Sequence, residues 1–158
     1  MKSSRRLSDG LGLAGWRVAP RLPTAPFPGA PGPDPQSEAY ARASAHLARW
    51  SVWEGAIVGE QDVGGGGFGG YLVSEEVFGD FELEIDAWPD WPADTGIMLR
   101  VTALGSQGFQ VLVDHRKSGG IGGFYGNGIG GFHALSYNVD ARPGSVTRAV
   151  HAGRRPRR

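Results

Sequence analysis

The fold is decided by the stretch FGDFELEIDAWPDWPADTGIMLRVTALGSQGFQVLVDHRKSGGIGGFYGNGIGGFH, residues 78–133. Apolar and polar residues alternate in it over three runs, 81–86, 97–101 and 109–114. Alternation with a period of two residues is typical of half-buried antiparallel strands. We therefore expect three successive strands whose apolar side chains face a shared core. That apolar set is Phe81, Leu83, Ile85, Ile97, Leu99, Val101, Phe109, Val111 and Val113.

The polar residues of the same runs form the second set. If the three strands pair in register, these side chains share the opposite face of the sheet. A face with several carboxylates, an arginine and a glutamine is a candidate ligand surface, and a merely solvated sheet face is the alternative. The set is Glu82, Glu84, Asp86, Arg100, Gln110 and Asp114.

Composition agrees with an all-β chain. The 158 residues include 27 Gly and 11 Pro, which indicates many turns between short strands. The length is that of one domain, and it is sufficient to bury a core without disulfides or structural metals. There is no cysteine, which excludes a disulfide framework and thiolate chemistry.

Charge is distributed unevenly. Residues 1–140 hold ten Lys and Arg and all sixteen Asp and Glu, a net charge of −6, whereas residues 141–158 hold six Arg and no acid. An acidic body argues against a nucleic-acid-binding domain. No run approaches the roughly 18 apolar residues of a membrane span, and 7–16 is too short and too polar for a secretory signal. We expect a cytoplasmic protein with no nucleic acid or membrane partner.

The chain order predicts one domain with an insertion. Residues 1–10 are expected to be flexible, 11–140 to form a single β-sandwich domain, and 141–158 to be a basic, disordered tail. Within 20–49, a loop with seven prolines at 20–35 precedes a short surface helix over 36–49.

Two local signals refine this order. Asp34 is the expected helix N-cap, with Pro35 at the first helical position. Residues 50–58 predict a hairpin that turns at Glu54 and Gly55. His46 is interpreted as a surface histidine.

Two loops carry candidate binding residues. Trp88, Trp91 and Asp94 lie in or beside a proline-containing loop, and aromatic rings next to carboxylates suit sugars. The alternative is that both indoles cap the edge of the core. Tyr125 and Asn127 lie among eight glycines in 119–131, which is explained equally by a ligand loop and by a string of turns.

The densest chemistry is at residues 114–117. Asp114, His115, Arg116 and Lys117 offer a base, an imidazole and two cations at a strand end. A solvated turn is the alternative.

Five segments together resemble a known family. Residues 50–58, 70–73, 78–85, 94–100 and 108–114, in this order and spacing, are similar to the 3-keto-disaccharide hydrolase-like domain, and 13–16 resembles its opening. The resemblance covers roughly residues 11–135. It implies a concanavalin A-like jelly-roll β-sandwich that acts on 3-keto-glycosides. It also implies further strands, so the tail is expected to be foreign to the domain, through a shifted reading frame or an early truncation.

The ketone of such a substrate implies a reaction by elimination and water addition. This needs a base near C2, a donor for the enolate oxygen and an acid for the leaving oxygen. The candidate bases are Asp114 and His115, the candidate donors Arg100 and Lys117, and the candidate acids Glu84 and Asp86. The candidate substrate-binding residues are Trp88, Trp91, Asp94, Gln110, Tyr125 and Asn127.

Four alternatives stay open. The first is a two-carboxylate glycosidase route with Glu82, Glu84 and Asp86. The second is a divalent metal held by Asp114, His115 and His133; the sequence establishes no cofactor beyond this option. The third is a non-catalytic carbohydrate-binding module of the same fold, and the fourth is a non-functional fragment. For the first three the partner is a small-molecule carbohydrate.

Overall fold

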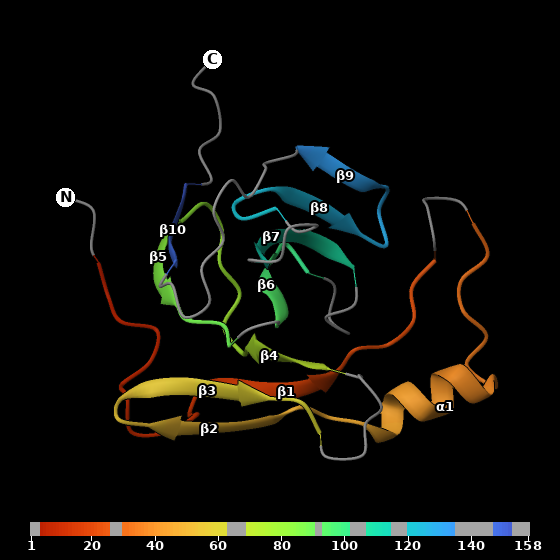
Figure 1. Ribbon diagram of the computed structural model, residues 1–158, viewed down its shortest axis with the longest axis horizontal. Coiled ribbons are helices and arrows are strands. Elements are labelled where there is room, and N and C mark those ends of the chain that lie inside the picture. Colours follow the sequence, from red (N-terminus) through yellow and green to blue (C-terminus); the bar gives the residue numbers. More distant parts are fainter. Residues whose placement is uncertain are drawn as a thin grey trace. The chain divides into compact units, whose positions relative to one another are not determined.

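The computed structural model describes residues 4–25, 30–62, 69–90, 93–101, 107–114, 120–134 and 147–152 (Figure 1). These residues form mostly strands, in several antiparallel sheets, with one short helix. The expected all-β class is confirmed at this level. The helix is not long and apolar enough to cross a membrane, and no other helix occurs in the described ranges.

The chain divides into two compact units. The N-unit comprises Met1–Pro23 and Gly32–Val77, and the C-unit comprises Thr24–Pro31 and Phe78–Arg158. The expectation of a single sandwich domain over 11–140 stays a prediction.

Two antiparallel strand pairs make up the sheets of the N-unit. β1 (Trp16–Pro20) pairs with β4 (Gly70–Ser74), and β2 (Arg49–Trp53) pairs with β3 (Ala56–Glu60). The predicted hairpin is confirmed, because Glu54 and Gly55 connect β2 to β3 with φ angles of 50° and 80°. Two successive left-handed residues match the twist of the flanking strands.

The helix begins later and ends earlier than expected. α1 spans Glu38–Ala45, and its N-cap is Ser37, whose Oγ accepts a hydrogen bond from the Tyr40 N–H at 3.2 Å. Asp34 was the wrong N-cap, because its carboxylate accepts from the Gln36 N–H at 2.9 Å in the preceding turn. Such side-chain turns compete with helix at Asp residues.

The C-unit contains a two-stranded and a four-stranded sheet. β5 (Glu82–Ala87) pairs with β10 (Thr147–Ala152). The second sheet has the order β6-β7-β8-β9, and every neighbouring pair in it is antiparallel (Figure 1). Its strands are β6 (Asp94–Leu99), β7 (Gly108–Asp114), β8 (Phe124–Asn127) and β9 (Gly131–Ala134). Val111 and Val113 are 1% exposed and are the largest fully buried side chains of the described residues.

The partner of β5 differs from the one that the sequence suggested. β5 does not share a sheet with β6 and β7, so the six polar residues of the three runs do not share one face. Its partner β10 lies within the segment that was expected to be a disordered tail. The connection 88–93 contains Pro89 and Pro92 and is too long for a tight hairpin turn. The edge of β5 is therefore available to a distant segment.

The apolar alternation is buried unevenly. Val111 and Val113 are buried as expected, but Ile85 is 37% and Phe109 38% exposed, and Phe81 lies outside β5. A two-stranded sheet covers less surface than a larger one, which accounts for the exposure of Ile85.

The close packing of Trp50 on Gly59 generates a stability prediction. These residues are cross-strand partners, and a Cβ at Gly59 would lie 2.5 Å from Cζ3 of the indole. We expect Gly59→Ala to lower the free energy of unfolding by about 1–3 kcal/mol, because the ring must move. Gly12→Ala is the matched control and should change it by less than about 0.5 kcal/mol, because no atom lies within 4 Å of that Cβ. Equal unfolding midpoints in urea for the two variants would contradict this packing.

Asp9 generates a prediction about pH. Its carboxylate accepts hydrogen bonds from the Leu11 and Gly12 N–H groups at 2.8 and 3.2 Å, and these hold the pKa of Asp9 below its usual 3.8. A lowered folded-state pKa stabilises the fold above the unfolded pKa, and this contribution is lost as the pH falls through the folded value. We expect wild type to exceed Asp9→Asn in stability at pH 6 and this difference to vanish in strong acid. An NMR titration midpoint for Asp9 at or above 3.8 would count against it.

Candidate functional site

One face of the four-stranded sheet gathers five of the predicted site residues. In an antiparallel pair, directly opposite residues point to the same side of the sheet. The register places Asp94 opposite Asp114 and Gln110 opposite Tyr125. Asp114 and Gln110 are four residues apart on β7, and Asn127 is two residues from Tyr125 on β8, so all five share one side. We call these five residues the acid–amide face.

The register divides this face into rungs. Asp94 and Asp114 form the first rung, Gly96 and Leu112 the second, and Gln110, between Met98 and Tyr125, the third. Opposite Cβ atoms are about 4.5–5.5 Å apart, and same-face rungs follow one another at about 6.5–7 Å. The first rung therefore places the Cβ atoms of two aspartates, one from each strand, close together on this face.

The two carboxyl groups differ in exposure. Asp114 is 5% exposed and is the only buried charged or polar residue of the described part of the chain. Asp94 is exposed, and Gln110, Tyr125 and Asn127 are half-buried. Aspartate is rarely buried, because its charge loses hydration. Among the described residues, the first rung is therefore distinguished by a buried carboxylate that pairs across the strands with an exposed one.

The side chain of Gln110 extends from the third rung toward the second. A Cβ at Gly96 would lie 2.5 Å from Nε2 and 2.8 Å from Cγ of Gln110. The Gln110 side chain therefore lies across β6 in the space that glycine leaves. This brings its amide one rung closer to the carboxyl pair.

Arg100, a predicted donor, is held elsewhere. It follows β6 with φ 55°, which takes its backbone out of the extended strand. Its Nη2 lies 3.4 Å from Oδ1 of Asp80, and its Cζ lies 5.8 Å from the centroid of the Phe81 ring. The guanidinium thus binds the residues that precede β5.

Of the remaining predicted residues, Glu84, Asp86 and Trp88 are described by the structure, and they lie away from the acid–amide face. Glu84 and Asp86 are exposed on β5, in the other sheet. Trp88 follows β5 and is 68% exposed, so it does not cap a core edge. His115, Lys117 and Trp91 lie outside the described residues.

The metal alternative depends on a residue beyond the described ranges. Within those ranges, no group of three or more His, Asp or Glu could hold a metal ion. The set inferred from the sequence includes His115, which those ranges omit, and His133, which lies in β9. That alternative remains a prediction.

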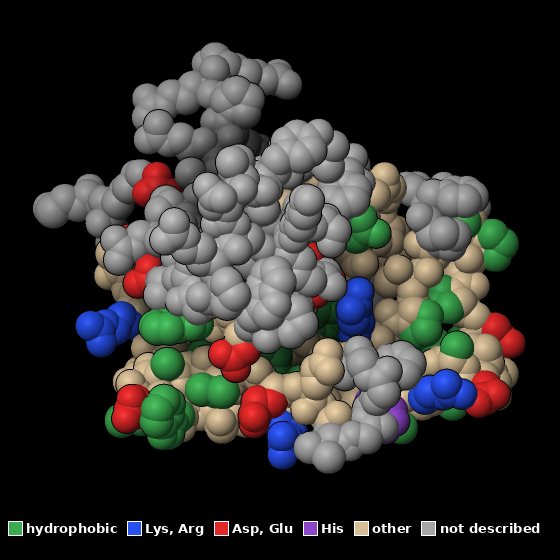
Figure 2. All heavy atoms as spheres, in the orientation of Figure 1, with side chains coloured by type: hydrophobic (Ala, Val, Ile, Leu, Met, Phe, Trp, Pro, Cys, Tyr) green, Lys and Arg blue, Asp and Glu red, His purple; other side chains and the backbone are tan. Residues whose placement is uncertain are grey.

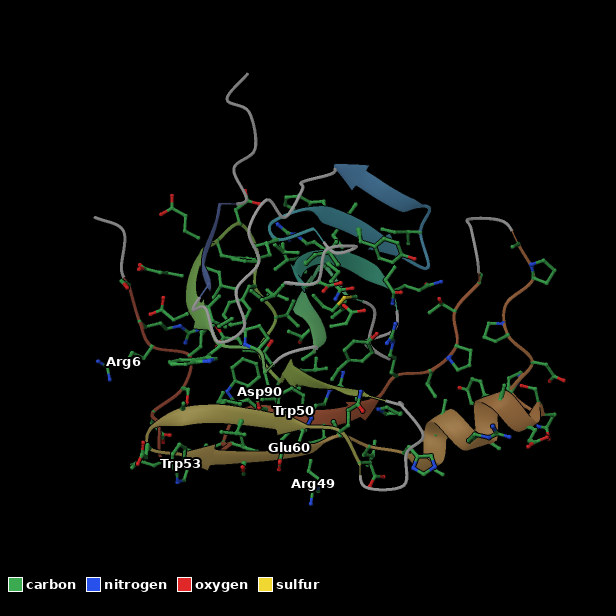
Figure 3. The ribbon with its side chains drawn as sticks, viewed as in Figure 1. Arg6, Arg49, Trp50, Trp53, Glu60 and Asp90 are labelled. Atoms are coloured by element: carbon green, nitrogen blue, oxygen red, sulfur yellow. The ribbon has the colours of Figure 1, made fainter. Side chains whose placement is uncertain are left out.

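The N-unit carries a separate group of polar and aromatic side chains. Arg49, Trp50, Trp53 and Glu60 all come from the β2–β3 hairpin (Figure 3). Arg49 Nη2 lies 3.7 Å from Glu60 Oε2, and Trp53 is 67% exposed. His46 is half-buried after α1, with Nδ1 3.1 Å from Asp62 Oδ2. The Arg49–Glu60 pair is exposed, and the His46–Asp62 pair is a single contact. Pairs of this kind are typical of a solvated surface.

Side chains of both charges lie on the visible surface. Figure 2 shows red and blue side chains among the described residues.

Comparison with known proteins gives a family. The model described as the 3-keto-alpha-glucoside-1,2-lyase-like domain matches residues 3–153. No curated protein and no solved structure matches the chain. The match includes β10, within the segment that was expected to be foreign to the domain. Because it covers nearly the whole sequence, and the five motif segments lie inside it, the chain belongs to the 3-keto-alpha-glucoside-1,2-lyase-like domain family.

Proposed function

We propose that this chain cleaves the glycosidic bond of a 3-keto-α-glucoside at the acid–amide face. The family description supports the substrate class. The observation that carries the proposal is the first rung, where buried Asp114 lies opposite exposed Asp94 on a face that also holds Gln110. The finer architecture that we propose is a concanavalin A-like jelly-roll sandwich, which the antiparallel sheets support.

The reaction follows from the ketone at C3. A base takes the proton from C2, and the C–H electron pair forms a C2=C3 double bond while O3 gains negative charge. The enolate then reforms the ketone, a C1=C2 double bond appears, and the C1–O bond breaks with its electrons on the departing oxygen. That oxygen takes up one proton. Addition of water across C1=C2 completes the hydrolysis, so no oxidant or reductant is consumed.

Asp114 is the base in this scheme. A general base must lie within hydrogen-bond reach of the proton that it removes, about 2.6–3.2 Å. Its burial excludes water, which strengthens its electrostatic effect on bound substrate. The departing oxygen needs one proton, and the proton taken from C2 supplies it. The Asp94–Asp114 rung keeps this proton until the C1–O bond breaks.

This assignment replaces the acid inferred from the sequence. Glu84 and Asp86 were candidates because they were expected to share a face with Asp114. They lie on β5, which pairs with β10 in a different sheet. We therefore assign the protonation of the departing oxygen to the Asp94–Asp114 rung.

The rest of the face binds the sugar. Tyr125 offers a ring and Asn127 an amide on the β8 side of Gln110. Aromatic faces and a few convergent polar groups are what saccharide sites use. The exposed indole of Trp88 supports a second candidate, a carbohydrate-binding module that holds the same ligands without turnover.

The base assignment predicts the behaviour of Asp114→Asn. We expect kcat for release of the chromophore from an aryl 3-keto-α-glucoside to fall by about 10²–10⁴-fold, because the amide accepts no proton. Substrate binding should persist, since the shape is retained. Glu84→Gln is the matched control and should keep wild-type turnover. Full activity of folded Asp114→Asn would remove Asp114 from the mechanism.

The elimination route predicts the fate of the hydrogen at C2. With substrate deuterated at C2, we expect a primary isotope effect on turnover and loss of deuterium to solvent. A two-carboxylate glycosidase leaves that deuterium in place, so retention would contradict elimination. EDTA in parallel assays would show whether a metal takes part. Saturable binding without release by folded protein, lost in Trp88→Ala, would favour the binding module instead.

A further inference from the structure

The amide of Gln110 lies where the elimination needs a hydrogen-bond donor. We infer that Gln110 Nε2 donates to the C3 oxygen of the substrate as this oxygen becomes an enolate, and that Gly96 is the positioning residue that makes this placement available. The inference rests on the proposed function, because it assigns a further role on the same face.

The rung spacing supplies the first argument. The backbone of Gln110 lies two rungs from the Asp94–Asp114 pair, roughly 13 Å along the strand. Since its side chain lies over Gly96, the amide reaches the second rung, about 6.5–7 Å from the pair. The folded-over side chain thus halves the distance between donor and base.

The size of the reacting group supplies the second argument. The C2 hydrogen and the C3 oxygen belong to neighbouring ring carbons. Base and donor each approach them to about 3 Å. The two protein groups can therefore be separated by at most two hydrogen-bond lengths plus the span between the adjacent atoms, roughly 8 Å, and one rung lies within this limit.

The chemistry of the donor supplies the third argument. A neutral amide stabilises negative charge on the C3 oxygen by donating a hydrogen bond. A cation at the same place would form an ion pair with the nearby carboxylates and weaken Asp114 as a base. Gln110 is therefore suited to a site that has to keep a basic carboxylate one rung away.

The same geometry sets Arg100 aside as the donor. Arg100 lies six residues from Asp94, roughly 20 Å along an extended chain. Its guanidinium is directed to Asp80 and Phe81. Gln110 takes the role for which Arg100 and Lys117 are the candidates from the sequence.

Gly96 alone cannot test this inference. A Cβ there would overlap Gln110 Nε2 at 2.5 Å, but it would also lie 2.5 Å from the Val111 carbonyl oxygen. Gly96→Ala thus disturbs the pairing of β6 with β7 as well as the amide. Substitutions of Gln110 leave the backbone contact unchanged and give the cleaner experiment.

The test compares three variants of the full chain on an aryl 3-keto-α-glucoside. Gln110→Met keeps the length but has no donor, and Gln110→Asn keeps the amide but is one methylene too short to reach Gly96. We expect both to lower kcat by about 10²–10³-fold with KM within a few-fold of wild type. Thr95→Val is the matched control, since Thr95 is exposed on the other side of β6 and should keep wild-type turnover.

An isotope measurement separates this role from a structural one. Without the donor, enolate formation slows, so the C2-deuterium isotope effect on kcat in Gln110→Met should be at least as large as in wild type. Wild-type kcat in either folded Gln110 variant, a raised KM with unchanged kcat, or a smaller isotope effect would overturn the inference while wild-type turnover stands. No turnover by wild-type protein would instead reject the proposed function.

Discussion

The pairing of β6 with β7 is the constraint on which the site depends. Its register puts Asp94 opposite Asp114 and leaves Gly96 beneath the side chain of Gln110. A slip of one residue would send Asp94 to the opposite face and separate the two carboxyl groups. Ile97 and Leu99, which alternate with Asp94 on the other side of β6, oppose such a slip because they would change face with it.

The ends of β6 show how neighbouring residues define the length of this strand. Arg100 adopts φ 55°, which interrupts the extended backbone after Leu99. The ion pair with Asp80 and the contact with Phe81 compensate part of the cost of that conformation, which is of order 1–3 kcal/mol. The guanidinium of Arg100 therefore lies with the residues that precede β5, and the amide of Gln110 lies over Gly96.

Much of the local structure was predictable. Alternation identified the strands at β5, β6 and β7, and the Glu54–Gly55 pair identified the β2–β3 turn. The sequence also indicates the helix, but it favours Asp34 as the cap, because an Asp before Pro is a strong helix-start signal. Each of the five residues of the acid–amide face is a candidate from the sequence. The pairing of Asp94 with Asp114 does not follow from it, because the register of two strands cannot be read across the residues that connect them.

The short-range pattern of this chain thus carries its β class, its turns and the residue types of its site. Strand partners do not follow from that pattern, because any exposed strand edge can pair with any other segment of suitable length. β5 meets β10 from more than fifty residues away in sequence, and so its acids lie in a sheet apart from Asp114. Which side chains share a face is settled by long-range pairing, where backbone hydrogen bonds and burial act together.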